Sequence, residues 1–429
     1  MKRGSILGYD LSEKYCQISF CDETTEEPET MENASDNYQI PLLIGKVRDR
    51  WVYGVEAKKL KTLGICSPVE DLFVKAVQRR RVALGDKIYD AVWLLAKFVA
   101  LTLREFEEIE YLTFTSPFTN EDMSKLLKGI AQRAGIPKDR VYVQDYKESF
   151  CQYMFYQPKE LWQYESALFF CDGQKINAYM LKRLNVSNSR EQELFVTVDE
   201  VASAHIKELD AIYPILHDEA RARSADERFR AFIQNVFEKK VISSVYLTGE
   251  GFEKNWYPMS LRVLCNGRRA FVGNNLYSKG ACYTSIRLCR EEDEGPAVYL
   301  DETKMTQQIS LRMRVNGKES WYPVVSWGTR WYEADGEWEV LLEDNSDLEV
   351  HVESLVGEEL QVEKISLRGL PERTDYSVRL RVEIMFLGER LCQLTLRDIG
   401  FGEFYPATDF KVTKEIHLGG INGQFNSMS

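Results

Sequence analysis

A strand–turn–strand pattern that occurs twice constrains the fold of this chain more than any other feature. Residues 8–20 form the first copy, in which Asp10 closes the first strand and a polar turn follows. Residues 167–181 form the second copy, with Asp172 and Gly173 at its turn. Asp-Gly between two apolar runs is a strong signal for a β-hairpin. Because the pattern recurs, the sequence predicts an internal duplication.

After each hairpin, helices and strands are expected to alternate. In several segments apolar residues recur every three to four positions, which is the helical period. The expected helices cover residues 69–82, 86–108, 120–134, 198–213 and 225–239, and the expected strands cover residues 111–115, 141–143 and 241–247. This alternation predicts an α/β fold for both halves of the region.

The later part of the chain has a different pattern. Residues 348–353 and 378–384 alternate between apolar and polar side chains, which is the period of a half-buried strand. Turn residues recur throughout, so a β-sandwich is expected. An acidic stretch ending in Gly295 and Pro296 marks the boundary between the two regions. The expected division is a first lobe at 1–160, a second lobe at 161–292, a β-sandwich at 297–418 and a frayed tail at 419–429.

The composition is that of a folded protein. Of 429 residues, 44% are hydrophobic and 12% are aromatic, which argues against extensive disorder. The net charge of −12 disfavours a nucleic-acid partner, since nucleic acids are bound mostly through their phosphates. Nine scattered cysteines and four histidines disfavour a zinc cluster and suit a reducing compartment. The sequence lacks an apolar leader and any run of about eighteen apolar residues, so we expect a cytoplasmic protein with no membrane partner.

Five segments resemble, in order, the motifs of one superfamily. They are residues 8–15, similar to the phosphate loop G-I-D-L-G-T-T-Y; 54–58, similar to G-D-A-A-K; 143–148, similar to I-N-E-P-T-A; 245–252, similar to the adenosine motif V-L-V-G-G-S-T; and 275–282, similar to the small-residue helix that follows it. The chain thus resembles the actin and seventy-kilodalton heat-shock chaperone superfamily, and the chaperone branch most closely. The resemblance implies a two-lobed α/β actin-like ATPase fold, built from duplicated ribonuclease-H-like domains and followed by a C-terminal all-β sandwich. No counterpart of the chaperones' helical lid is expected.

The resemblance also implies roles for three residues. Asp10 would hold a hydrated Mg²⁺ ion, because magnesium keeps several waters and needs few carboxylates. Lys58 would stabilise charge on a transferring phosphoryl group, and Asp145, in place of the family's glutamate, would orient the attacking water. The alternatives are a turn aspartate for Asp10 and a solvated helix lysine for Lys58.

Three short segments would hold the nucleotide if the resemblance extends to the site. The residues concerned are Ser12, Glu13 and Lys14; Asp172, Gly173 and Gln174; and Gly249, Glu250, Gly251 and Phe252. Gly249 and Gly251 permit a close backbone approach to a ribose or phosphate. A carboxylate at Glu13 would repel phosphates, and Lys14 could offset it.

The second hairpin allows two alignments with the family's second phosphate loop. With the strands in register, the family's metal-side aspartate falls on Phe170, which cannot hold a hydrated cation. In a shifted register it falls on Asp172, although Asp172 and Gly173 are better explained as a plain hairpin turn than as a phosphate loop.

The leading hypothesis is a chaperone-like protein that binds ATP or ADP with Mg²⁺ between its two lobes. Hydrolysis would be weak or absent, and the β-sandwich would bind a protein or peptide partner. One alternative is a degenerate scaffold of the same fold that binds no nucleotide. Another is an active ATPase or small-molecule kinase.

Overall fold

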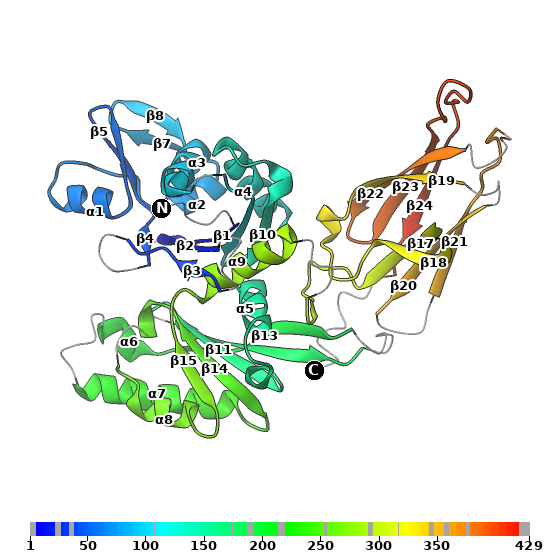
Figure 1. Ribbon diagram of the computed structural model, residues 1–429. Coiled ribbons are helices and arrows are strands. Elements are labelled where there is room, and N and C mark those ends of the chain that lie inside the picture. Colours follow the sequence, from blue (N-terminus) through cyan, green and yellow to red (C-terminus); the bar gives the residue numbers. More distant parts are fainter. Residues whose placement is uncertain are drawn as a thin grey trace. The chain divides into compact units, whose positions relative to one another are not determined.

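The computed structural model divides the chain into two compact units (Figure 1). The first unit comprises Met1–Lys182 and Thr197–Pro296, and the second comprises Arg183–Val196 and Ala297–Ser429. The structure describes residues 6–21, 27–33, 38–106, 108–173, 175–186, 193–212, 219–252, 255–290, 295–315, 317–342, 347–355, 360–371, 373 and 378–419.

The strands that build the first unit form two groups along the chain, β1 to β10 before helix α5 and β11 to β15 after it. They are β1 (Ile6–Leu11), β2 (Tyr15–Cys21), β3 (Glu29–Thr30), β4 (Ile40–Pro41), β5 (Ile44–Val47), β6 (Arg50–Tyr53), β7 (Arg81–Leu84), β8 (Lys87–Asp90), β9 (Tyr111–Ser116), β10 (Val141–Asp145), β11 (Glu165–Cys171), β12 (Lys175–Leu184), β13 (Phe195–His205), β14 (Ile242–Thr248) and β15 (Arg269–Val272). The helices are α1 (Gly54–Thr62), α2 (Leu72–Val77), α3 (Ala91–Thr102), α4 (Glu121–Arg133), α5 (Tyr146–Phe155), α6 (Lys207–Ile212), α7 (Glu219–Val236), α8 (Pro258–Leu264) and α9 (Leu276–Cys289). No helix of the described residues is long and apolar enough to cross a membrane.

The two main sheets of the first unit have the same strand order. One reads β10-β9-β1-β2-β3 and the other β15-β14-β11-β12-β13. In each sheet, the strand that comes first in the sequence, β1 or β11, pairs antiparallel with the next strand, β2 or β12. It also pairs parallel with a later strand, β9 or β14. The structure thus repeats one topology in two successive halves, β1 to α5 and β11 to α9. Membership of the actin-like class remains a prediction.

Local signals explain where the helices of the first half begin. The Asn120 side chain accepts a hydrogen bond from the Met123 N–H at 2.8 Å and caps α4. Met123, Leu127 and Ile130 then face the core, at the helical spacing of three to four residues.

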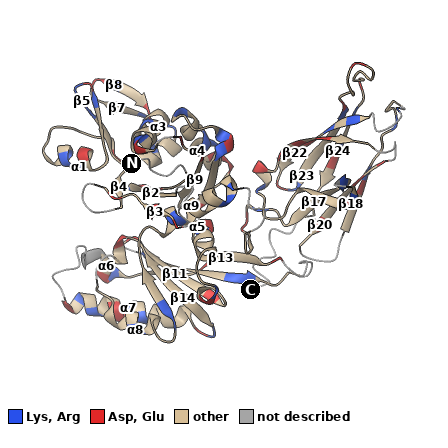
Figure 2. Ribbon diagram, in the orientation of Figure 1, with Lys and Arg blue, Asp and Glu red and all other residues tan. Residues whose placement is uncertain are grey.

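In the second half, α7 carries charges of both signs on its outer face, while Phe229 is buried (Figure 2).

Helix α9, from the second half, packs closely on elements of the first half. A Cβ atom added at Gly280 would lie 2.0 Å from the carbonyl oxygen of Ser149 in α5. One added at Gly8 in β1 would lie 2.2 Å from the backbone nitrogen of Cys282. Both glycines are therefore needed for backbones to approach this closely. The contact fixes the two halves of the first unit together.

One expected helix proves to be a strand. Residues 198–213 were expected to be helical, but β13 covers 198–205, the first half of that range, and only the short α6 follows. Val196, Thr197 and Val198 are β-branched, which restricts their side chains in a helix and favours a strand. From Val201 to His205, exposed and partly buried residues alternate along β13, which is the period of a strand and not of a helix.

Two other expected helices are shorter than their periodicity suggested. In place of 69–82 and 86–108, α2 and α3 are separated by the hairpin of β7 and β8. Gly85 lies at the turn with a φ of +62°, a conformation that favours glycine and interrupts a helix.

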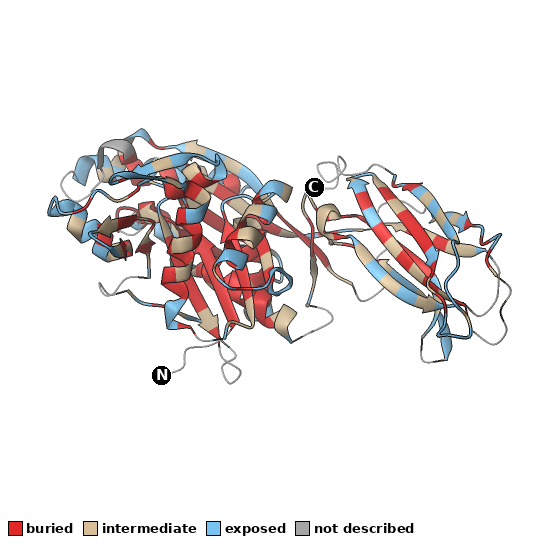
Figure 3. Ribbon diagram, turned by 90° about the horizontal axis from the view of Figure 1, so that it is seen from above, coloured by how far each residue is buried: buried red, intermediate tan, exposed pale blue. Residues whose placement is uncertain are grey.

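The two main sheets of the second unit are antiparallel. Its strands are β16 (Val298–Tyr299), β17 (Gln307–Val315), β18 (Lys318–Val325), β19 (Gly336–Leu341), β20 (Leu348–Ser354), β21 (Leu360–Ile365), β22 (Arg379–Gly388), β23 (Leu391–Asp398) and β24 (Lys411–His417). Sheets β18-β17-β20-β21 and β19-β22-β23-β24 contribute to one apolar core, with Ile309 and Val350 from one and Val382 and Leu394 from the other. Figure 3 shows the alternation of buried and more exposed residues along these strands.

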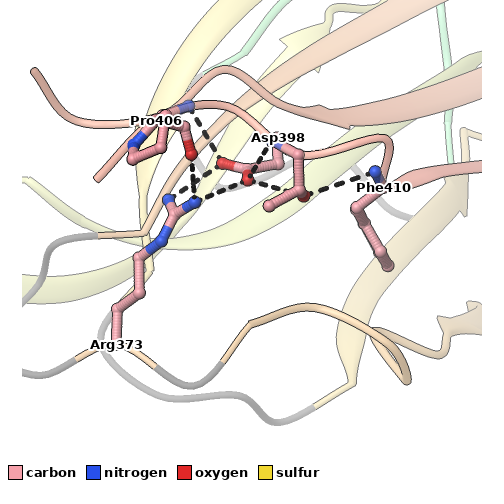
Figure 4. Close-up of polar contacts among 6 residues, drawn as sticks. Arg373, Asp398, Pro406 and Phe410 are labelled. Atoms are coloured by element: carbon pink, nitrogen blue, oxygen red, sulfur yellow. Dashed lines mark hydrogen bonds and ion pairs between the residues drawn. The ribbon is translucent and has the colours of Figure 1, made fainter. Parts of the chain in front are cut away.

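A buried ion pair holds the end of β23 in place (Figure 4). Both terminal nitrogens of Arg373 contact Asp398, at 3.0 and 2.8 Å, and one also donates to the Pro406 carbonyl. The Asp398 carboxylate accepts further bonds from the Gly400 and Thr408 backbone and from the Thr408 hydroxyl. Burial opposes ionisation of Asp398, but the hydrogen bonds from Gly400, Arg373 and Thr408 outweigh it and hold its pKa below the usual value.

Candidate functional site

A cleft of about 660 Å³ lies in the first unit and is lined by residues from both of its halves. Three turns contribute to it: the turn of the first hairpin, the turn of the second hairpin, and the turn after β14. Helix starts and the inner face of β11 and β12 complete the wall. The lining residues are Ser12, Glu13, Lys14, Tyr15, Pro117, Tyr146, Lys147, Leu168, Phe170, Asp172, Gly173, Asn177, Tyr179, Leu209, Gly249, Glu250 and Tyr277.

The register of the two hairpins shows which residues occupy equivalent positions. In the first, Asp10 pairs with Gln17 one step before the turn; in the second, Phe170 pairs with Asn177 one step before the turn. Both turns contain the same number of residues between the last paired positions. Phe170 therefore corresponds to Asp10, and Asp172, two residues later, is the first residue of its turn and corresponds to Ser12. The in-register alignment agrees with this geometry.

Side chains of the protein already accept hydrogen bonds from backbone N–H groups at all three turns. The Ser12 hydroxyl accepts from the Lys14 and Tyr15 N–H groups at 3.3 and 3.1 Å. The Asp172 carboxylate accepts from the Lys175 N–H at 2.8 Å. These are the donors that a phosphate-binding turn would direct at its anion.

The third turn shows the same feature. The Gly249 N–H donates to the Asn274 side-chain oxygen at 2.9 Å, and Gly249 has a φ of +101°. A Cβ atom there would lie 2.2 Å from the Cys171 carbonyl oxygen, so the turn after β14 sits directly against the end of β11. The close approach that glycine permits at this position is to the protein's own backbone.

Asp10 lies beneath the cleft rather than on its surface. Its side chain is fully buried, and one carboxylate oxygen accepts a hydrogen bond from the Tyr146 hydroxyl at 2.7 Å. The other oxygen has no hydrogen-bond partner among the described residues. Burial raises the pKa of Asp10 to about 7, while the bond from Tyr146 opposes the rise. The raised pKa favours the protonated form of this carboxyl group more than that of an exposed aspartate.

An aromatic wall separates Asp10 from the cleft. The rings of Tyr146 and Tyr277 stack with their centroids 3.9 Å apart and their planes 3° from parallel. Phe170 packs near Tyr277 with a centroid distance of 6.5 Å. Burial raises the pKa of both tyrosines well above the ordinary value, so their hydroxyls stay neutral. Tyr15 and Tyr179 extend the aromatic lining.

The charged groups of the cleft are mixed in sign. Glu13, Asp172 and Glu250 are acidic, whereas Lys14 and Lys147 are basic. Lys14, from the first half, lies 3.5 Å from Glu250, from the second. Because the Lys14 side chain is largely exposed, this ion pair adds little stability. It nevertheless places the cation of the first turn beside a carboxylate.

The predicted site residues divide into those that line the cleft and those that do not. The lining ones are Ser12, Glu13, Lys14, Asp172, Gly173, Gly249 and Glu250. Lys58 is exposed on α1 and is not among the residues that line the cleft. Asp145 caps α5, since its carboxylate accepts from the Glu148 N–H at 2.8 Å. Gln174 lies outside the described residues.

Gly251 and Phe252, the last two predicted nucleotide contacts, belong to the core of the second half. A Cβ atom at Gly251 would lie 2.2 Å from the Cys171 sulfur. Phe252 is buried, with its ring centroid 5.5 Å from that of Phe229. Both residues therefore hold the turn after β14 in position from below and do not line the cleft.

Sequence reasoning missed the aromatic residues of the site. Tyr146 and Tyr277 come from helices distant in the chain, so nothing local indicates that they stack. The sequence does carry a signal for two residues of β12. Asn177 and Tyr179 are two positions apart in an expected strand and therefore point to the same side of the sheet. The strand order places that side on the cleft.

The surroundings of Asp10 do not fit a hydrated magnesium ion. The Tyr146 hydroxyl occupies one oxygen of the carboxyl group, and the whole Asp10 side chain is buried. At the equivalent position of the second half, Phe170 supplies no oxygen ligand. Magnesium prefers several oxygen ligands and waters in an octahedron, which these residues do not offer.

Fold and site together define a two-unit protein with a ligand-sized cleft in a duplicated α/β unit. The chain belongs to a family of unknown function, DUF5716, whose C-terminal model matches residues 27–302. A domain of unknown function, DUF8552, matches residues 304–418. The first match covers most of the α/β unit, and the second covers the β-sandwich. A search of curated proteins finds no match to the chain.

Proposed function

We propose that this protein is a chaperone-like nucleotide-binding protein that takes ATP or ADP in the cleft of its first unit. The observation that supports the proposal most is that turns 12–14, 172–173 and 249–250 line one cavity of about 660 Å³. That volume lies within the range of small-molecule and cofactor sites, about 300–1,000 Å³. The resemblance assigns the same three turns to the nucleotide.

Hydrolysis in this cleft is weak or absent. Phosphoryl transfer needs a cation at the terminal phosphate and a group that positions water. Lys58 lies outside the lining residues, and Asp145 is engaged as a helix cap. Neither residue reaches the cleft in the arrangement described above.

The β-sandwich of the second unit is the proposed site for a protein or peptide partner. It exposes several apolar side chains, among them Leu387 and Phe404, whose exposed fractions are 50% and 93%. Large apolar residues on a surface are typical of interaction sites when they lie together.

A scaffold that binds no nucleotide is the second candidate. It is favoured by the intramolecular hydrogen bonds at the turns and by Phe170 at the position equivalent to Asp10. An active ATPase or small-molecule kinase is supported less, because it requires Lys58 in the cleft.

Thermal unfolding with ATP or ADP at millimolar concentration tests the proposal. A ligand that binds only the folded state raises the unfolding midpoint. We expect a rise that Tyr179→Ala, in the cleft, reduces and that Tyr164→Ala, an exposed tyrosine outside it, leaves unchanged. The absence of any rise would favour the scaffold. Phosphate release that Lys58→Ala abolishes would favour the active enzyme.

A further inference from the structure

The cleft presents ring faces and a hydrogen-bond acceptor where a polyphosphate would need donors and cations. We infer that it recognises the nucleoside part of its ligand, the base and the sugar, and that neither magnesium nor the phosphate chain contributes to affinity. This inference rests on the proposed function and specifies which part of the nucleotide the site binds.

The backbone hydrogen-bond donors at the turns are already engaged by side chains of the protein. A phosphate is held at a turn by N–H groups that converge on it. At the first turn those of Lys14 and Tyr15 point to the Ser12 hydroxyl, and at the third turn that of Gly249 points to Asn274. A phosphate at either turn would have to displace a bond the protein already makes, so its net contribution is small.

The charges of the residues that line the cleft also disfavour a phosphate chain. Among the described lining residues, three carboxylates face two lysines, and one of those lysines lies beside Glu250. A triphosphate would bring several negative charges into this surrounding. Like charges at short range disfavour binding. Magnesium would normally offset that charge, but Asp10 is buried and Phe170 offers no ligand.

The groups that remain suit a planar base and a sugar. Phe170, Tyr15 and Tyr179 line the cleft and can offer ring faces or edges to a base. The Asn177 side-chain nitrogen donates to the Tyr179 hydroxyl at 3.2 Å. The Asn177 oxygen is buried and has no partner within the described part of the chain. An amino group of a base or a sugar hydroxyl can satisfy it.

Calorimetric titration of the full chain with adenosine, AMP, ADP and ATP tests the inference, each in magnesium and in EDTA. We expect adenosine to bind at least as tightly as ATP, and EDTA to change each dissociation constant by less than about twofold. ATP binding that is at least about tenfold tighter than adenosine binding, or that EDTA abolishes, would overturn the inference and leave the proposed function standing. If none of the four ligands binds, the proposed function fails and the inference fails with it.

A pair of variants tests the role of Asn177. Asn177→Leu keeps the size of the side chain and removes the acceptor, so we expect the dissociation constant for adenosine to rise about tenfold or more. Asn235→Leu makes the same change at an exposed position of α7, outside the cleft, and should not alter binding. Equal affinity of the Asn177→Leu variant and the unaltered chain would contradict the assignment of Asn177, whatever the unfolding midpoints of the two variants.

Discussion

At the residue scale, the buried carboxyl of Asp10 links the stability of the first unit to pH. Its pKa is raised to about 7 in the folded chain, chiefly by burial, above the value of about 4 for an exposed aspartate. The folded state therefore binds more protons than the unfolded state between these values. The stabilising contribution is complete below the unfolded pKa and is lost as the pH rises through about 7.

We expect Asp10→Asn to stabilise the first unit increasingly as the pH rises from 5 to 8, by up to about 4 kcal/mol. The asparagine cannot ionise, and its amide can donate to Gln17, whose side-chain oxygen lacks a partner among the described residues. Urea unfolding of the two proteins across this pH range measures the effect. A difference in unfolding free energy that stays constant with pH would mean that Asp10 does not titrate here.

Removing the one hydrogen bond to Asp10 should have the opposite effect. Tyr146→Phe keeps the ring that stacks on Tyr277 but leaves the buried carboxylate without its donor. We expect a loss of about 1–3 kcal/mol at pH 8 and a smaller loss at pH 5, where Asp10 is protonated. Tyr164→Phe, at an exposed tyrosine, is the control. Equal losses of stability at the two pH values would show that the hydrogen bond from Tyr146 does not stabilise the ionised form of Asp10 more than the protonated form.

The same residues show what the sequence could and could not reveal about the site. The three turns are local features of the sequence, and the resemblance to the family's loops is what assigned Ser12, Asp172 and Gly249 to the site. The burial of Asp10 could not, because it depends on Tyr146 and Tyr277, which approach only through packing of α5 and α9. Asp145 was predicted to orient water, a role that the sequence could not weigh against helix capping.

At the scale of elements, the contact between α5 and α9 sets how the halves of the first unit meet. Gly280 has no room for a side chain because its neighbour is the backbone of Ser149, which cannot give way as a flexible side chain could. A glycine in another helix of the same unit lacks this constraint. Gly129 in α4 has nothing within 4 Å of an added Cβ atom.

Two glycine substitutions should therefore change stability in opposite directions. Gly129→Ala should stabilise by about 0.5–1 kcal/mol, because alanine loses less conformational freedom in a helix. Gly280→Ala should destabilise by more than about 2 kcal/mol, since α9 must move away from α5. Chemical unfolding of both variants measures the difference. A stabilised Gly280→Ala protein would contradict the close packing of these helices.

Strands and helices were predictable to different degrees. Helix α4 has a capping Asn120 and a clear apolar face, and its observed span differs from the expected 120–134 by one residue at each end. Strand β13 was expected to be a helix, because its apolar positions also fit a period of three to four residues. Its place beside β12 in the sheet decides its structure, and the spacing of apolar residues does not reveal that pairing.

At the scale of the whole molecule, the buried ion pair of Arg373 and Asp398 lies in the second unit, so its contribution can be tested separately from the stability of the first unit. Arg373 and Asp398 have side-chain exposures of 5% and 0%, so removing one leaves the other charge buried. We expect Arg373→Met to cost about 3–5 kcal/mol. Calorimetry should show the loss in the transition of the second unit, which contains every residue of this network.

The matched change Arg312→Met, at an arginine more than half exposed and paired with Glu319, should cost less than about 1 kcal/mol. Similar losses for the two arginines would contradict the special position of Arg373. The pKa of Asp398 is lowered, so the stability it confers should be retained at neutral pH and lost on acidification through its folded-state pKa.

The paired turns of the duplicated unit also bear on how such a chain can diverge. Ser12 uses a hydroxyl and Asp172 a carboxylate, yet each accepts a hydrogen bond from the backbone N–H three positions later. One turn shape is thus kept by two different side chains. The two turns are therefore related more clearly by the position of the hydrogen-bond acceptor than by residue identity, and a comparison of the halves by sequence alone misses the correspondence.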